Sequence, residues 1–259
     1  MRGSIVVGTD GSTPARSALL WAGARAVAMR STLTLVHVSS RGESGNVGDD
    51  ARADPLRTGI RTLRAVYPAL DTLTEQCVGK PFAGLADASR KADLLVIGTH
   101  KTGFIQGRAI GSRYLDLPSA VAVPVAVIPS VPLTSRRGVV VGVDDSATGW
   151  RAVEIAADTA ESAGERLTLV FPPQSRLLAD AADRVRRCHP RLEVSARVAR
   201  HGVVRDLIDS AMVAALVVLA YPAAAEPVGS EGAAGVRDLL LNLAGPAMVI
   251  PRSGPENCR

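Results

Sequence analysis

Aromatic residues are scarce in this sequence: Phe, Trp and Tyr together fill only 3% of its 259 positions. The 47% hydrophobic content must therefore come mainly from Ala, Val, Leu and Ile, and these residues have to build the core. Proteins that bind single-stranded nucleic acid stack its bases on aromatic side chains. The shortage of such platforms argues against that class of function.

Cysteine is also rare, and long hydrophobic runs are interrupted. Cys77, Cys188 and Cys258 are far apart and form no C-x-x-C pair, so we expect neither a disulfide framework nor a zinc site. The apolar run at residues 5–7 is too short for a secretory signal. The uncharged stretch 211–225 is shorter than the roughly 20 residues that a membrane helix needs. We therefore expect a cytoplasmic protein without a membrane partner.

Signatures of catalysis are missing as well. The sequence contains no H-E-x-x-H, no G-x-S-x-G and no G-x4-G-K-[ST]. His37 falls within a predicted strand, where it packs or bonds locally, and His100 has no carboxylate or nucleophile fixed near it by the sequence. These absences argue against an enzyme.

The formal charge of +5 is unevenly distributed. Residues 1–134 hold 15 basic and 10 acidic side chains, whereas residues 135–259 hold 15 of each. A basic surface favours duplex DNA weakly. However, only three of the basic residues are lysines, and a bias toward arginine is typical of GC-rich genomes. We therefore expect no nucleic-acid partner.

The chain repeats itself. Residues 5–12 (IVVGTDGS) recur as 139–146 (VVVGVDDS), and LTLV at 33–36 recurs at 167–170, both at an offset of 134. Later matches, including P-V-A-V-I-P at 124–129 and P-A-M-V-I-P at 246–251, have an offset of 122. The order of the matches predicts two homologous domains, the second shortened by 12 residues between positions 172 and 189.

Each copy alternates short β-branched runs with longer helical patterns. The first copy predicts strands at 4–8, 32–38, 72–78, 93–98 and 124–128, with helices at 14–29, about 50–66, 81–91 and 112–119. Strands with continuous apolar runs are typical of a parallel sheet covered on both faces. Thr13-Pro14 predicts a helix start with Thr13 as the capping residue. The fold class is therefore α/β.

Small and polar residues follow the predicted strands of the first copy. Gly8-Thr9-Asp10-Gly11-Ser12 follows the first strand, and the fourth is followed by Gly98 and later by Gly111-Ser112. Glycines let backbone N–H groups approach an anion, and Asp10 offers acceptors for ribose hydroxyls. The same residues could also serve only to make tight strand-to-helix turns. From the residues alone, both interpretations stay open.

These motifs resemble those of the universal stress protein family, in the tandem form, over nearly the whole chain. Members that bind nucleotide carry G-x2-G-x9-G-[ST] after the fourth strand. Here Gly98 and Gly111-Ser112 fill the outer positions, while Lys101 replaces the middle glycine. The V-G-T-D-G-S sequence around Asp10 is typical of the family's acidic position.

The resemblance implies ATP as the ligand, with or without Mg²⁺. It places the adenine against Val38 and Ile97 with Thr9 nearby, the ribose on Asp10, and the phosphates at the glycine loop and Arg113. The site residues that we expect are Thr9, Asp10, Val38, Ile97, Gly98, Lys101, Gly111, Ser112 and Arg113. The ammonium of Lys101 either obstructs the phosphates or pairs with them.

The second copy departs further from the family pattern. Ala220 replaces Gly98, Pro222 lacks an N–H group, and Ala233-Ala234 replace Gly111-Ser112, so that only Asp144 survives. We therefore expect nucleotide in the first copy alone.

The family fold implies two tandem Rossmann-like domains, each with a five-stranded, mainly parallel sheet of order 3-2-1-4-5 and helices on both faces. We place them at 1–130 and 136–254, joined by the linker 130–135. In the family the last strands of two domains pair, which would pair the strands ending at Ile128 and Ile250. A homodimer of whole chains stays open.

The function that this resemblance favours is an ATP-binding stress-response regulator. The alternative is a universal stress protein that acts independently of nucleotide as an interaction or structural module. The sequence offers no nucleophile or paired carboxylate for an enzyme on this fold, such as an adenylyl transferase. We therefore expect at most weak ATP hydrolysis.

Overall fold

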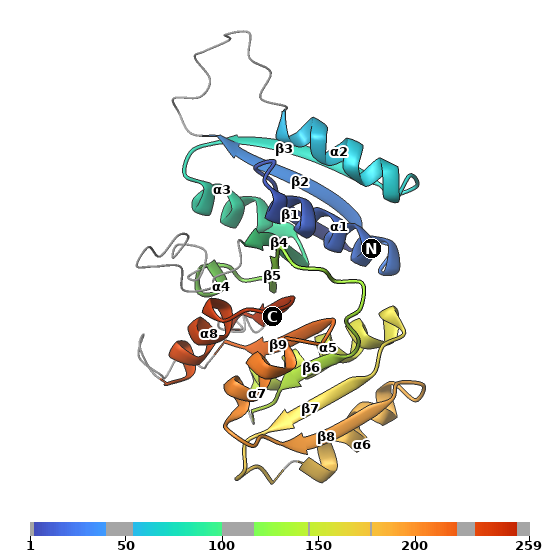
Figure 1. Ribbon diagram of the computed structural model, residues 1–259, viewed down its shortest axis with the longest axis vertical. Helices are drawn as coiled ribbons and strands as arrows, with labels where there is room; N and C mark the ends of the chain where they lie inside the picture. Colours follow the sequence, from blue (N-terminus) through green and yellow to red (C-terminus); the bar gives the residue numbers. More distant parts are fainter. Residues whose placement is uncertain are drawn as a thin grey trace, which may run out of the picture. The chain divides into compact units, whose positions relative to one another are not determined.

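The computed structural model describes residues 3–39, 54–99, 117–144, 146–176, 178–221 and 231–252. It has the α/β architecture that the sequence predicts, with helices between the strands of parallel sheets (Figure 1). The chain divides into two compact units, and in the described residues the division falls between Ser130 and Val131. Each unit is described by itself.

Unit 1 contains a five-stranded parallel sheet in the order β3-β2-β1-β4-β5. Its elements in chain order are β1 (Ser4–Gly8), α1 (Thr13–Ala28), β2 (Thr32–Ser39), α2 (Pro55–Val66), β3 (Thr72–Val78), α3 (Pro81–Ala88), the 3₁₀ turn η2 (Ser89–Lys91), β4 (Leu94–Thr99), α4 (Leu117–Ala120) and β5 (Val125–Pro129). The predicted strands and helices agree with these bounds to within a few residues where the structure describes them.

The alternation of side chains along β2 shows which helices cover each face of this sheet. A Cβ added at Gly59 of α2 would lie 2.8 Å from Leu35, and one added at Gly84 of α3 would lie 2.8 Å from Val38. Because neighbouring strand residues point to opposite faces, α2 and α3 pack on opposite faces of the sheet. Helix α1 packs beside α2.

Unit 2 repeats the same order as β8-β7-β6-β9-β10, again parallel. Its elements are β6 (Val139–Gly142), α5 (Ala147–Ala163), β7 (Leu167–Phe171), α6 (Leu178–Cys188), β8 (Val194–Val198), α7 (Val203–Ser210), β9 (Leu216–Ala220), α8 (Glu231–Leu241) and β10 (Ala247–Ile250). The connection from β7 to α6 covers 172–177, whereas that from β2 to α2 covers 40–54. The deletion therefore shortens a connection and spares the helix.

Both cores consist mainly of Ala, Val, Leu and Ile, as the composition requires. The largest fully buried side chain is the aromatic Phe171 at the end of β7. Among the described residues no helix is both long and apolar enough to cross a membrane.

The start of α1 corrects one sequence-based expectation. Thr13 is the first helical residue, and the cap is Ser12, whose hydroxyl accepts a hydrogen bond from the N–H of Ala15 at 3.3 Å. Ser146 caps α5 in the same way, accepting from the N–H of Gly149 at 2.9 Å. A capping side chain must lie outside the helix, with extended backbone, and Ser12 is the residue with that geometry.

A buried carboxylate holds the loop between β8 and α7 in unit 2. Asp206 is 6% exposed and accepts hydrogen bonds from the guanidinium of Arg197 and from the backbone N–H groups of Arg200 and His201. Burial by itself would raise the pKa of Asp206, but these hydrogen bonds outweigh it and hold the pKa below its usual value. The charged form of Asp206 is therefore the one that stabilises the fold.

We expect Asp206→Asn to destabilise the protein by about 2 kcal/mol at pH 7, since charge-assisted hydrogen bonds contribute on that scale. A depressed pKa stabilises the folded state above the unfolded pKa, near 4, and this contribution disappears as the pH falls through the folded value. The gap between wild type and variant should therefore narrow when urea unfolding is followed from pH 5 to pH 3. A gap that is constant over this range would contradict the assignment.

Candidate functional site

The carboxyl ends of β1, β2 and β4 meet at one edge of the unit 1 sheet. Strand β1 lies between β2 and β4, so the chain leaves β1 toward β2 through α1 and reaches β4 on the other side. Ligands of open α/β sheets bind at such a reversal of strand order, outside the carboxyl ends of the strands.

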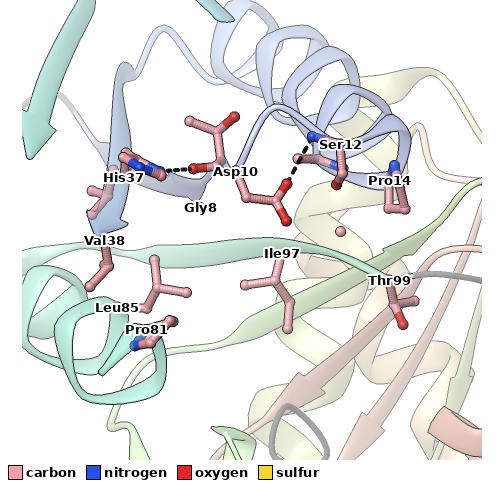
Figure 2. Close-up of a pocket in the computed structure, with 14 residues that line it drawn as sticks. Gly8, Asp10, Ser12, Pro14, His37, Val38, Pro81, Leu85, Ile97 and Thr99 are labelled. Atoms are coloured by element: carbon pink, nitrogen blue, oxygen red, sulfur yellow. Dashed lines mark hydrogen bonds between the residues drawn. The ribbon is translucent and has the colours of Figure 1, made fainter. Parts of the chain in front are cut away.

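The turn between β1 and α1 is held by its own side chains. Gly11 adopts a φ of 79°, which favours glycine. The Oδ1 atom of Asp10 accepts a hydrogen bond from the N–H of Ser12 at 2.9 Å. Figure 2 shows the second carboxylate oxygen of Asp10 turned away from Ser12, toward the side where Ile97 lies. Asp10 is exposed, so this oxygen can meet a ligand.

His37 is fixed against the end of β1. Its Nδ1 atom lies 2.8 Å from the carbonyl oxygen of Thr9, and because a carbonyl only accepts, Nδ1 carries the proton. The N–H of Thr9 in turn donates to the carbonyl of Val36 at 2.9 Å. These bonds extend the contact between β1 and β2 to the rim of the site. The sequence-based expectation that His37 bonds locally is confirmed.

A cavity of about 270 Å³ opens beside this turn (Figure 2). Its walls combine apolar side chains with a polar edge. The lining residues are Gly8, Thr9, Asp10, Ser12, Pro14, Ala15, Val36, His37, Val38, Pro81, Leu85, Ile97, Gly98 and Thr99. Among the described residues that line it, Asp10 is the one carboxylate. A cavity of this make-up suits a mostly apolar ligand that carries hydrogen-bonding groups at one edge.

The structure brings together five of the residues that the sequence singled out. The residues that line one cavity are Thr9, Asp10, Val38, Ile97 and Gly98. The other four expected residues, Lys101, Gly111, Ser112 and Arg113, lie outside the described residues.

Sequence reasoning missed one wall of the cavity. Pro81 and Leu85 of α3 line it, but apolar residues in a helix carry no signal of a site. His37 also lines the cavity, although the sequence indicated only a local bond. The repeat held a clue here, because the residue that matches His37 in the second copy is Phe171.

Gly98 has a packing role that its place in a glycine motif does not reveal. A Cβ at this position would lie 2.3 Å from the carbonyl oxygen of Pro14 and 2.7 Å from the backbone nitrogen of Ala15. The first turn of α1 therefore lies directly against the end of β4. Glycine is needed here for the approach of the helix, whatever ligand the cavity holds.

The matching region of unit 2 is built differently. Phe171 and Val143, both buried, stand where unit 1 has His37 and Thr9. A Cβ added at Gly142 would lie 2.7 Å from Val203, 3.0 Å from Leu207 and 3.1 Å from Leu219, so three apolar side chains converge there. At the matching Gly8 of unit 1, the three nearest atoms all belong to the side chain of Leu85, at 3.0, 3.2 and 3.7 Å.

Asp144 of unit 2 accepts more hydrogen bonds within its own turn than Asp10 does. Its Oδ1 atom accepts hydrogen bonds from both the N–H and the hydroxyl of Ser146, at 2.9 and 2.5 Å. A Cβ at Gly149 would lie 2.0 Å from the same oxygen, so the carboxylate folds over the start of α5. In unit 1, Ala15 occupies the position of Gly149, and its Cβ blocks this arrangement.

Comparisons with known proteins point to one family. The model of the universal stress protein family matches residues 1–129. A universal stress protein of Mycobacterium tuberculosis is 30% identical over 252 residues, covering 88% of this chain and 91% of the relative. A second one from the same organism is 28% identical over 185 residues, covering 64% of this chain and 62% of the relative.

Among solved structures, a universal stress protein of Archaeoglobus fulgidus superposes with a TM-score of 0.69 at 16% identity and covers 97% of this chain and 98% of its own. A structure described as a putative universal stress protein of Pseudomonas aeruginosa reaches 0.65 at 16% identity, with coverages of 98% and 94%. At such identities the likeness shows a shared fold.

The close approach of Gly98 to α1 can be tested directly. We expect Gly98→Ala to destabilise the protein by about 2 kcal/mol, because the added methyl meets backbone atoms that cannot move aside. Gly8→Ala is the matched control, since the three atoms nearest to its methyl belong to the side chain of Leu85, which can shift. Urea unfolding measures both, and equal losses would contradict this account.

Proposed function

This chain belongs to the universal stress protein family, and we propose on that footing that unit 1 binds an adenine nucleotide, ATP, as a stress-response regulator. The observation that carries the proposal is the cavity at the carboxyl ends of β1, β2 and β4. It places the carboxylate of Asp10 beside the apolar side chains of Val38, Leu85 and Ile97.

The chemistry of this cavity matches the parts of a nucleoside. A purine is flat and largely apolar, so it suits the space between Val38, Leu85 and Ile97. The outward oxygen of Asp10 can accept hydrogen bonds from ribose hydroxyls, and a charged acceptor makes such bonds stronger than neutral ones. His37 and Thr9 close the polar edge through their mutual hydrogen bond.

The size of the cavity indicates which part of the ligand it holds. Pockets for drug-sized ligands measure roughly 300–1,000 Å³, and this one, at about 270 Å³, lies just below that range. It therefore suits the nucleoside, with the phosphates outside. We expect Lys101, Gly111, Ser112 and Arg113 to hold the phosphates, with or without Mg²⁺.

We propose one nucleotide site per chain. In unit 2 the residues that match Thr9 and His37 are the buried Val143 and Phe171, and Oδ1 of Asp144 accepts two hydrogen bonds from Ser146. Three apolar side chains converge on Gly142, whereas the three nearest atoms at Gly8 of unit 1 all belong to Leu85. These differences favour a unit 2 that serves as a structural partner.

Binding rather than turnover is the favoured role. Asp10 is the one carboxylate among the described lining residues, and one ring nitrogen of His37 is occupied by its bond to Thr9. General acid–base hydrolysis would need a second positioned group that acts on water. A regulator of this kind would change conformation or partner contacts when the nucleotide binds.

Calorimetry with ATP and Mg²⁺ tests the proposal, and we expect one binding event per chain. Asp10→Ala should weaken ATP binding about tenfold, which corresponds to the loss of one charge-assisted interaction. Asp144→Ala is the matched control, because it removes the equivalent turn carboxylate from unit 2 and should leave the affinity unchanged.

Other results of this titration would decide against the proposal. Two equal sites per chain would contradict the asymmetry of the units. Absence of binding heat, together with no thermal shift on adding ATP, would select the alternative of an interaction module that acts independently of nucleotide.

The location of the nucleoside can be tested by replacing His37 with phenylalanine, the residue at the matching position 171 of unit 2. His37→Phe should weaken ATP binding more than about tenfold, since the larger ring takes up cavity space and the bond to Thr9 is lost. His37→Asn, whose amide can replace Nδ1 as the donor, should stay within a few-fold of wild type. Wild-type affinity in His37→Phe would place the nucleoside elsewhere.

A further inference from the structure

Helices α1 and α2 of unit 1 carry basic side chains and no acidic ones. Neither 11–39 nor 55–70 contains an Asp or a Glu, although each contains three arginines. The matching helices of unit 2, α5 and α6, mix both signs and pair them, as in Arg184 with Glu154 at 3.8 Å. The positive excess of the chain is therefore concentrated on one pair of helices.

Three arginines of α2 form a row that faces solvent. Arg57, Arg61 and Arg64 are spaced by four and three residues, so they fall within about 60° of arc and span about 10 Å of helix. All three are exposed, and the buried Gly59 and Leu63 lie roughly opposite them on the helix. Among the described residues none of the three takes part in an ion pair.

A fourth exposed arginine follows the neighbouring helix α1. The hydroxyl of Tyr67, which ends α2, donates to the carbonyl of Leu20 at 3.3 Å, and Cβ at Gly23 would lie 2.9 Å from Leu63. The two helices therefore run side by side, and both end near the edge of the sheet where its strands begin. Arg30, which follows α1 and is exposed, lies at that end.

The backbone of Arg30 is unusual. It has a φ of 52°, and it is the one described residue other than glycine with positive φ. The N–H of Ser31 donates to the carbonyl oxygen of Ala26, and that of Arg30 donates to the carbonyl oxygen of Val27. This pattern ends a helix and favours glycine at the position of Arg30. Unit 2 has Gly164 at the matching position, with a φ of 64°. An unfavourable residue kept on an exposed corner points to a role for its side chain.

Exposed aliphatic side chains accompany these charges. Val27 and Met29, beside Arg30, are 51% and 44% exposed. A nucleic-acid backbone would satisfy the arginines but would give these side chains no apolar partner. Insertion into a membrane needs a continuous apolar stripe, whereas α1 and α2 bury theirs within unit 1.

We propose that the arginine face, defined as Arg30, Arg57, Arg61 and Arg64, docks an acidic segment of another protein that also carries aliphatic side chains. Guanidinium groups bind carboxylates through paired hydrogen bonds. The row along α2 matches carboxylates that recur at the same spacing on a helix. Val27 and Met29, beside Arg30, supply the apolar contacts at one end.

The test titrates the full chain, without nucleotide, into a labelled helical peptide and follows the fluorescence anisotropy of the peptide. The peptide carries glutamates at i, i+4 and i+7, with leucines between them. We expect binding that weakens as salt rises and that is lost when glutamine replaces glutamate. R57E/R61E should weaken it about tenfold, as two exposed ion pairs of ordinary strength would. R187E/R191E is the matched control, with the same change in net charge, and should bind like wild type.

Arg30→Gly should change stability and peptide binding in opposite directions. It should raise the melting temperature by about 2–4 °C, because glycine removes the backbone strain, and should weaken peptide binding several-fold. Circular dichroism checks that the reversed variants fold, and R57Q/R61Q replaces R57E/R61E if that pair does not.

Several results would overturn the proposal. Equal weakening in R187E/R191E would show a general charge effect. Tighter binding of a short DNA duplex, or of vesicles that contain phosphatidylserine, would assign the face to those partners instead. Unchanged affinity in Arg30→Gly would remove Arg30 from the face.

Discussion

The contact between the end of β4 and the first turn of α1 is the constraint on which the unit 1 site depends. Because Gly98 has no side chain, the backbone of Pro14 and Ala15 can lie directly against it. That position sets where α1 begins, and the cap at Ser12 and the carboxylate of Asp10 follow from it. The cavity lies between this turn, the end of β2 and α3.

The two units show how a few substitutions change the residues at the carboxyl end of the first strand. His37 to Phe171 and Thr9 to Val143 replace polar residues by buried apolar ones, and Ala15 to Gly149 gives the carboxylate of Asp144 room to fold over the start of α5. Buried apolar side chains stabilise a core in proportion to the area that they remove from water. Unit 2 thus gains packing where unit 1 retains space for a ligand.

The distribution of charge over the helices shows more than the net charge of the chain does. An arginine bias explained by genome composition would scatter its charges, but α1 and α2 collect arginines without acids, while α5 and α6 balance them. The same unit thus has both the cavity and the arginine face. The pairing of the last strands of the two domains, and a homodimer of whole chains, stay predictions.

Much of the architecture was decided by the sequence itself. Continuous apolar runs such as 5–7 and 94–97 specify buried parallel strands, and the internal repeat specifies two copies of one sheet order, because these are local patterns of hydrophobicity. The place of Asp10 directly after β1 followed from the sequence, whereas its hydrogen bond to Ser12 did not. The expectation that Thr13 caps α1 was wrong by one residue, since capping depends on backbone angles that a Ser-Thr-Pro sequence leaves open.

Only the tertiary structure decided which residues share the cavity and what each one contacts. Leu85, His37 and Ile97 are far apart in the chain, and no periodicity shows that they line one space. The need for glycine at position 98 depends on how α1 packs against the sheet, and the positive φ of Arg30 appears only in the folded chain. Local sequence determines the elements, whereas contacts between distant elements determine the site.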